Sequence, residues 1–156
     1  MARVLKPPTP LPAAFETPTL FLAGSIEMGS AANWQQAIES AVRHRDITIL
    51  NPRRDEWDAT WEQDIASPQF SSQVTWELEA QERADGILMY FAPETRAPVT
   101  LLELGLFART GKLVVCCPPG FWRIGNVDVV CARYAVPQVP SLADLCAYAE
   151  AWEKPW

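Results

Sequence analysis

The sequence predicts an α/β fold in which helices cover both faces of a parallel sheet. Short apolar segments alternate along the chain with longer segments that have one apolar and one polar side. The short segments, such as TLFLAG (19–24) and DGILMYF (85–91), are apolar almost throughout, which is typical of strands buried on both faces. Ligands in such sheets bind beyond the carboxyl ends of the strands, so the loops that follow strands are the expected place for a site.

The length and composition are those of one ordinary globular domain. The chain has 156 residues, 49% of them hydrophobic, and a formal net charge of −6. The acidic balance argues against a nucleic acid or an anionic membrane as the partner. No segment approaches the ~20 apolar residues of a membrane span, and the first residues lack the apolar core of a secretory signal, so we expect a cytoplasmic protein. Four cysteines without paired spacing and a single histidine indicate reduced thiols and no metal site.

The strands are predicted from apolar segments that end in glycine, proline or a polar turn. Five segments meet this description, and all are expected in one parallel sheet. They span residues 19–24, 46–52, 85–91, 112–118 and 127–134.

The helices are predicted from helical spacing of apolar residues and from capping side chains. Ser30 or Asn33 is expected to cap the first helix, and Ser71 or Ser72 the second. The first helix is expected to end near His44, and the second to span residues 71–84. The third is expected to run from Pro98 to about Gly111, and the last to span residues 141–154.

Two segments lie outside this alternation. Residues 1–17 are rich in proline and are expected to form an extended arm, lying on the domain of residues 18–156 or on a neighbouring subunit. Residues 53–70 lack a clear period and are too long for a simple turn, which indicates a functional loop. The four loops that follow strands carry much of the polar chemistry, at residues 23–27, 51–57, 92–98 and 118–126.

The usual nucleophile and phosphate-binding motifs are weak in this chain. A triad built on Ser25 would need His44, which lies between two arginines near a helix end and is better explained as a solvated imidazole. The adjacent Cys116 and Cys117 lie in an apolar strand and are expected to be structural. AGSIEMGSA is neither a GxGxxG sequence nor a phosphate loop with its lysine.

Carboxylates are the better candidates. Glu103 lies in an apolar helix, PVTLLELGLFARTGK, where a buried and unpaired carboxylate would be costly, which favours a functional role; a partly exposed helix position is the alternative interpretation. Glu77 lies on the preceding helix. Asp55 in the long loop and Asp85 at a strand start are two further candidates, with a solvated loop position and a structural helix-to-strand role as the alternative interpretations.

Several short motifs follow one another in a fixed order: FLAGSI, NPRR followed by Trp, a WE-containing helix, AD at a strand start, YFAPETRAPVTLLELG and GFWRIGNV. This ordered set resembles the nucleoside 2-deoxyribosyltransferase family, and most closely its 2-deoxyribosyltransferase-like branch. The resemblance runs from about residue 18 to about residue 135. It implies a flavodoxin-like domain that cleaves an N-glycosidic bond with retention of configuration. It also implies that no cofactor is needed and that the partners are a nucleoside, a nucleobase and further copies of the chain.

The resemblance implies roles for individual residues. Glu103 matches the nucleophilic glutamate, and Glu77 the acid that handles the leaving base. Two segments are expected to contact substrate: the turn after the first strand and the loop of Asn126, which a neighbouring subunit often supplies. Trp57, Trp61, Phe121 and Trp122 are possible surfaces for a nucleobase, whereas Trp76 is expected in the core. The full set of expected binding residues is Ala23, Gly24, Ser25, Asp55, Trp57, Asp85, Phe91, Trp122 and Asn126.

The chain also departs from the family pattern. Leu20 stands where typical members have a tyrosine that orients the nucleophile, and Ala97 where transferases have an acid and nucleotide glycosidases a serine. No arginine follows GSI, so nucleoside monophosphates are disfavoured unless Arg53, Arg54 and Arg123 converge on the site. Three functions remain open: transfer of the sugar to a second base, transfer to water, and binding of a nucleoside without turnover.

Overall fold

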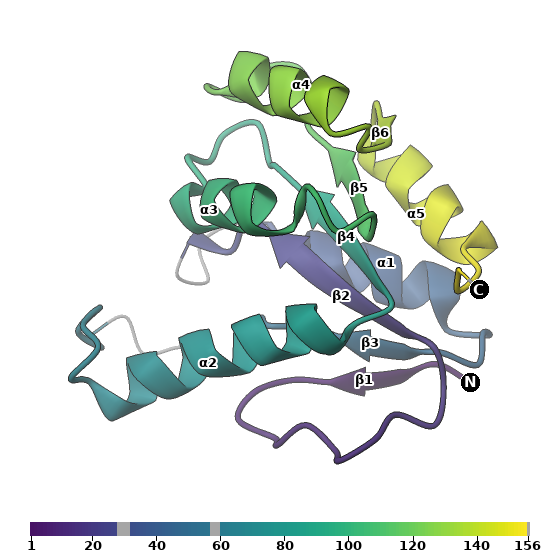
Figure 1. Cartoon of the computed structure of the whole chain (residues 1–156). Helices are drawn as coiled ribbons and strands as arrows, with labels where there is room; N and C mark the ends of the chain where they lie inside the picture. Colours follow the sequence, from purple (N-terminus) through teal and green to yellow (C-terminus); the bar gives the residue numbers. More distant parts are fainter. Residues whose placement is uncertain (28–31, 57–59, 156) are drawn as a thin grey trace.

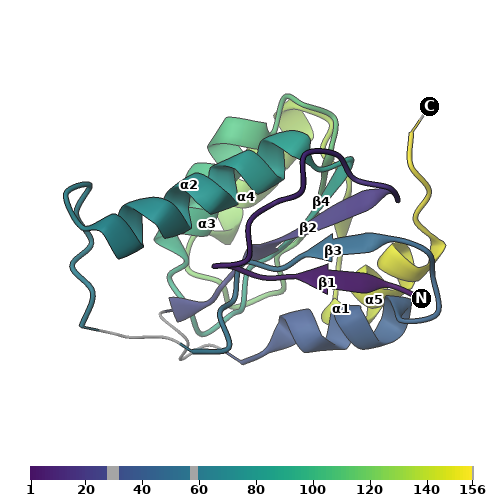
Figure 2. The same cartoon turned by 90° about the horizontal axis from the view of Figure 1, so that it is seen from below.

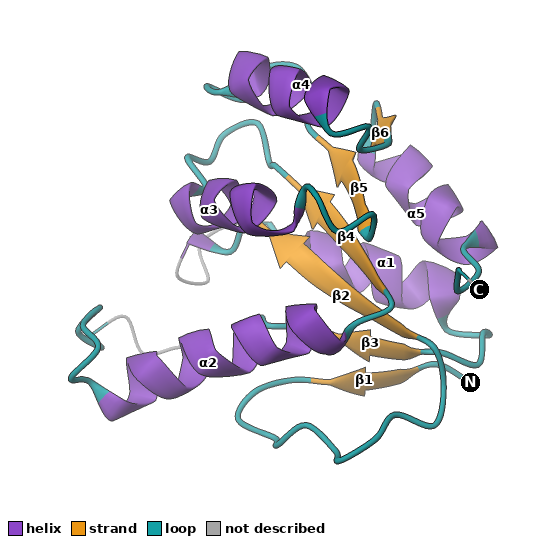
Figure 3. Ribbon diagram, in the orientation of Figure 1, coloured by secondary structure: helices purple, strands orange, loops and turns teal. Residues whose placement is uncertain are grey.

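The computed structural model describes residues 1–27, 32–56 and 60–155, and contains one six-stranded parallel sheet (Figures 1 and 3). The sheet has the order β1-β3-β2-β4-β5-β6, and every neighbouring pair is parallel. The strands are β1 (Arg3–Leu5), β2 (Thr19–Gly24), β3 (Thr48–Leu50), β4 (Gly86–Tyr90), β5 (Leu113–Cys116) and β6 (Gln138–Val139). The helices of the described residues are α1 (Trp34–Val42), α2 (Pro68–Arg83), α3 (Pro98–Phe107), α4 (Ile124–Arg133) and α5 (Leu142–Ala151).

The helices form a layer on each face of the sheet, as the apolar strands predict (Figures 1 and 2). Helices α2, α3 and α4 pack on one face, and α1 and α5 on the other. Successive residues of a strand point to opposite faces, so Phe21 and Ala23 join the first layer while Leu20 and Leu22 join the second. A strand with a core on both sides needs apolar residues at every position, which explains the continuous runs in the sequence.

The order of the strands places a ligand site at the end of β2. From β2 the chain passes through α1 to β3 on one side, and then through α2 to β4 on the other side. The connections therefore diverge at the carboxyl ends of β2 and β4, which is the position where open α/β sheets bind ligands. The parallel, doubly wound α/β class is confirmed.

The sheet has six strands, and the prediction of five was wrong in two places. Residues 127–134 are not a strand, because residues 127–133 belong to α4 and Tyr134 follows its last residue. Val127 and Cys131 are buried four residues apart while Asp128 and Val129 are exposed, which is a helical period hidden by the β-branched residues. The short β6 takes the expected edge position beside β5 instead.

The sixth strand, β1, comes from the proline-rich arm. It pairs in parallel with β3, from Arg3 beside Thr48 to Leu5 beside Leu50. The rest of the arm lies on its own chain, where the carbonyl of Thr9 accepts a hydrogen bond from Trp76 Nε1 at 2.9 Å. Leu11 and Phe15 pack against the core under α2 and α3. The arm was expected to be extended, but an edge strand within it was not foreseen.

The helix starts show which capping predictions were correct. Asn33 caps α1, accepting a hydrogen bond from the amide of Gln36. Helix α2 begins with Ser67 and Pro68, earlier than the predicted caps at Ser71 and Ser72. None of the helices in the described part of the chain has the length and apolar character needed to span a membrane.

Candidate active site

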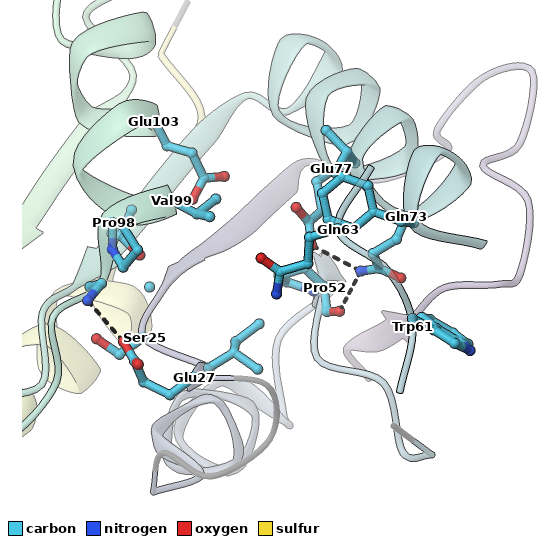
Figure 4. A pocket seen from close by; sticks show the side chains of 16 residues that line it. Ser25, Glu27, Pro52, Trp61, Gln63, Gln73, Glu77, Pro98, Val99 and Glu103 are labelled. Carbon is cyan, nitrogen blue, oxygen red and sulfur yellow. Dashed lines mark hydrogen bonds between the residues drawn. The ribbon is translucent and has the colours of Figure 1, made fainter. Parts of the chain in front are cut away.

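A pocket of about 350 Å³ opens beyond the carboxyl end of β2, where the topology places a ligand site (Figure 4). Its walls come from the end of β2 and the loop after it, from the inner face of α2, from the first turns of α3, and from the loop that follows β3. Two of the residues that line it are Glu77 and Glu103. The two catalytic candidates of the sequence therefore face the same cavity.

Glu103 lies on the inner face of α3 and is only 7% exposed. It shares this face with Thr100, Leu104 and Phe107, so the packing of the helix itself turns the carboxylate inward. Its Oε2 accepts a hydrogen bond of 2.5 Å from Nε2 of Gln81 on α2. The Gln81 amide thus holds the glutamate in largely apolar surroundings.

Glu77 is held on α2 by glutamines one turn away on either side. Gln73 Nε2 donates to Glu77 Oε1 at 2.9 Å and to the carbonyl oxygen of Pro52 at 3.0 Å. Gln81 Nε2 donates to the carbonyl oxygen of Glu77 as well as to Glu103. Residues 73, 77 and 81 follow the four-residue spacing that places side chains on one helix face. The same face of α2 therefore carries the glutamine that binds the Glu77 carboxylate and the glutamine that binds the Glu103 carboxylate.

Burial and mutual repulsion change the acidity of both carboxyl groups. Burial and, to a smaller extent, the charge of Glu77 raise the pKa of Glu103 to about 8, and the Gln81 hydrogen bond opposes this change. Burial raises the pKa of Glu77 to about 6, against the hydrogen bond from Gln73. At neutral pH the pair therefore holds one proton, and the higher pKa of Glu103 places this proton mainly on Glu103.

Ser25 connects the end of β2 to the loop before α3. Its hydroxyl accepts a hydrogen bond from the amide of Ala92 at 3.1 Å and lies 2.7 Å from the Thr95 hydroxyl. Its carbonyl oxygen accepts a hydrogen bond from Trp34 Nε1. Gly24 and Ser25 both line the pocket, but these contacts assign the Ser25 hydroxyl to holding the loop in place.

The other expected binding residues within the described part of the chain do not line this pocket, apart from Gly24 and Ser25. Ala23 and Phe91 are buried in the core, where Phe91 packs on Phe121. Asp55 is exposed and forms an ion pair with Lys6. Trp57 lies outside the described residues.

Three further expected binding residues also lie away from this pocket. Asp85 lies at the amino end of β4, opposite the pocket, where it accepts two hydrogen bonds from Thr19 and pairs with Lys154. Trp122 is half exposed and donates from Nε1 to the carbonyl oxygen of Arg96. Asn126 is exposed in the first turn of α4 and not in a loop. Asp85 therefore has the structural role that was its alternative interpretation.

The arginines do not converge on the pocket either. Arg53 donates to the carbonyl oxygen of Ala32, Arg54 stacks on Trp61 at 4.7 Å, and Arg123 stacks on Trp122. None of the three is among the residues that line the pocket.

The position of Leu20 in the structure shows whether a tyrosine at this position could reach Glu103. Leu20 points to the α1 and α5 face of the sheet, whereas Glu103 lies on the other face. A side chain at position 20 therefore has no access to Glu103, and Phe21 is the β2 residue on the correct side. Gln81 makes the contact with the nucleophile candidate instead.

Sequence reasoning missed Glu27, Gln73 and Gln81. The two glutamines could have been found, because they lie four residues before and after Glu77 on one helix. Glu27 lies in a loop, and only the tertiary structure brings its carboxylate to the amide of Ala97, at 2.8 Å. In the described part of the chain, no group of three or more metal-binding side chains is clustered.

Fold and site together define an α/β protein with a pocket at the carboxyl end of its parallel sheet, lined by Glu77 and Glu103. A sequence model of the family described as nucleoside 2-deoxyribosyltransferase like matches residues 17–121. The match covers more than half of the chain, and the chain belongs to this family. Comparison with curated proteins found no match.

Proposed function

We propose that this protein cleaves the N-glycosidic bond of a 2′-deoxynucleoside with Glu103 as nucleophile, and transfers the sugar to a second nucleobase. The observation that carries this proposal is the buried Glu103 carboxylate facing the same pocket as Glu77, in a chain of this family. Retaining glycosyl transfer needs two such carboxyl groups, one to attack the sugar and one to handle the proton of the leaving group.

The first step would form an ester between the sugar and the protein. A Glu103 carboxylate oxygen attacks C1′, and the bond between C1′ and the base nitrogen breaks with its electron pair leaving on the base. Glu77 gives its proton to the departing base. In the second step a nitrogen of another base attacks C1′, the ester bond breaks to restore the Glu103 carboxylate, and Glu77 accepts the proton from the incoming base.

The environment of the pair supports these roles. The reaction needs the shared proton on Glu77 and the charge on Glu103. A bound nucleobase would exclude water from Glu77 and so raise its pKa further, and loss of the Glu77 charge removes part of what raises the pKa of Glu103. Binding of the base would thus move the proton to the group that has to donate it.

The walls of the pocket offer places for both parts of a nucleoside. Trp61 and Phe70 line the pocket near Gln73 and Glu77, and their rings are suited to contact a planar base. The sugar would lie on the opposite side, along the first turns of α3, where Pro98, Val99 and Thr100 line the pocket. Figure 4 shows Pro98 and Val99 on the side of the pocket that carries Glu103.

We further propose that the active form is a homo-oligomer in the cytoplasm. Val99, Leu102 and Leu106 form an apolar strip on the outer side of α3 and are 56, 62 and 53% exposed. Val99 also lines the pocket, so a second chain covering this strip would close one wall of the site. Asn126 does not line the pocket of its own chain, so a substrate contact by Asn126 would have to be made in the pocket of a neighbouring chain.

The decisive experiment is mass spectrometry of the intact protein mixed with a panel of 2′-deoxynucleosides, with free base measured in parallel. We expect a deoxyribosyl adduct that maps to Glu103, and exchange of bases when a second base is added. Free base without exchange would instead assign the hydrolytic reaction. Binding without adduct, free base or exchange would contradict catalysis and assign a nucleoside-binding role.

Matched variants make the result specific. Glu103→Gln should abolish the adduct and all base release, and Glu77→Gln should lower base release by roughly 100-fold. Glu82→Gln makes the same change at an exposed position of α2 and should leave both signals unchanged. Base release that persists in Glu103→Gln would overturn the assignment of the nucleophile.

A further inference from the structure

All the charged residues that line the pocket within the described part of the chain are acidic. Glu27, Glu77 and Glu103 line it, and no lysine, arginine or histidine does so among the described residues. Residues 28–31 and 57–59, which are not described, contain no basic residue in the sequence. A phosphate group bound in this pocket would therefore meet like charges, with no cation among the described lining residues to compensate them, and Arg54 lies outside this lining, stacked on Trp61.

Glu27 occupies the position where an anion would otherwise bind. Its Oε1 accepts a hydrogen bond of 2.8 Å from the amide of Ala97, the residue that precedes the first turn of α3 (Figure 4). The amino end of a helix attracts anions through its free amides and its dipole. In this chain the protein's own carboxylate already fills that position.

The backbone on both sides of this contact is unusual. Glu27 has a φ of 48° and Ala97 a φ of 46°, in the left-handed region that residues other than glycine rarely adopt. Such conformations persist only where the surrounding structure holds them, and they concentrate at ligand sites. The hydrogen bond between the two residues is one contact that holds them, so the placement of Glu27 is a built feature of the pocket.

The distance along α3 relates Glu27 to the reaction. Glu103 lies six residues after Ala97, which corresponds to about 9 Å along the helix axis, and helical side chains lean toward the amino end. A sugar with its C1′ at Glu103 would therefore direct its opposite end toward Ala97 and Glu27. In a nucleoside this end carries the 5′-hydroxyl, or the phosphate of a 5′-nucleotide.

We propose that Glu27 determines the substrate class, by accepting a hydrogen bond from the 5′-hydroxyl of a nucleoside and excluding a 5′-phosphate. The inference rests on the proposed function for the identity of the ligand. The exclusion of an anion rests only on the geometry of Glu27, Ala97 and the acidic pocket.

The test compares each 2′-deoxynucleoside with its 5′-monophosphate, by kcat/KM and by calorimetric binding. We expect the wild-type protein to prefer the nucleoside at least 100-fold. Glu27→Ala removes the charge and frees the Ala97 amide, and should narrow this preference at least tenfold through better binding of the monophosphate. Glu27→Gln keeps the contact with Ala97 and should weaken nucleoside binding while improving monophosphate binding less than Glu27→Ala does.

Glu94→Gln is the matched control, because Glu94 is exposed in the loop before α3 and does not line the pocket. It should leave the preference unchanged. Equal use of nucleoside and monophosphate by the wild type, or an unchanged preference in Glu27→Ala, would overturn the inference.

Binding of inorganic phosphate separates this inference from the proposed function. If no nucleoside is turned over but Glu27→Ala gains phosphate binding that the wild type and Glu94→Gln lack, anion exclusion by Glu27 stands and the catalytic proposal fails. If nucleosides are turned over through Glu103 but Glu27→Ala gains neither phosphate nor monophosphate binding, the catalytic proposal stands and the role of Glu27 fails.

Discussion

Glu103 is placed where its charge costs the folded protein free energy. Its side chain is buried on the inner face of α3, and the hydrogen bond from Gln81 does not replace the water that a free carboxylate would bind. The raised pKa is the thermodynamic expression of this cost. Once its proton has moved to Glu77, a Glu103 carboxylate deprived of water is also a stronger nucleophile, so the same burial that lowers stability supports the proposed chemistry.

The cost predicts that Glu103→Gln stabilises the protein in a pH-dependent way. The folded pKa of about 8 lies above the unfolded value, so the folded state loses stability relative to the variant as the pH rises toward 8. We expect Glu103→Gln to raise the free energy of unfolding by about 2 to 4 kcal/mol at pH 8 and by almost nothing at pH 4. Urea denaturation at both pH values measures the difference.

The exposed Glu82→Gln is the control, and should change the free energy of unfolding by less than about 0.5 kcal/mol at either pH. A stabilisation by Glu103→Gln of equal size at pH 4 and pH 8 would show that its charge is not the cause.

At the level of elements, the end of β2 is fitted closely between α1 and β4. A Cβ atom on Gly24 would lie 2.5 Å from Trp34 Cζ2 and 2.5 Å from the carbonyl oxygen of Tyr90. One of these neighbours is backbone and the other a buried ring, so neither can move easily. Glycine at this position allows β2 to pass close to both and to deliver Ser25 to the pocket.

Gly24→Ala is therefore expected to lower the free energy of unfolding by about 2 to 4 kcal/mol, because the added methyl group overpacks this contact. Gly125→Ala is the matched change, since a Cβ on Gly125 in α4 would meet nothing within 4 Å. It should stabilise the protein by up to about 1 kcal/mol through helix propensity. Thermal and urea unfolding compare the two variants, and a tolerated Gly24→Ala would contradict the close fit.

For some helices and strands, the local sequence was sufficient to predict the structure. Strands β2, β4 and β5 were predicted because each is apolar on both faces, and α1 because Asn33 caps it and Trp34, Ile38 and Val42 share one face. Helix α4 was taken for a strand because Val127, Val129 and Val130 favour β-structure locally. Packing on the sheet outweighed that preference, burying Val127 and Cys131 as a helix does.

At the level of the whole molecule, the outer side of α3 is the surface that the single chain leaves uncovered. Val99, Leu102 and Leu106 recur at spacings of three and four residues, as they would on a helix with a second buried face. Their place beside the pocket connects the proposed assembly to the proposed reaction.

Leu102→Lys should break a homo-oligomer formed through this strip, because it places a charge in an apolar contact. We expect sedimentation velocity to give a dimer or larger species for the wild type and a monomer for Leu102→Lys. Leu78→Lys, on the exposed side of α2, is the control and should keep the wild-type state. A monomeric wild type at high micromolar concentration would refute assembly through α3.

The sequence by itself determined the fold class, the family resemblance and the pair Glu77 and Glu103, because apolar periodicity and short motifs are local properties. The tertiary structure alone decided which other residues share the pocket with that pair. Asp85 and Asn126 seemed suitable from sequence, yet β4 carries Asp85 to the opposite end of the sheet and α4 carries Asn126 to the surface. Glu27, 70 positions from Ala97 along the chain, reaches its amide because parallel strands deliver the loops after β2 and β4 to one edge of the sheet.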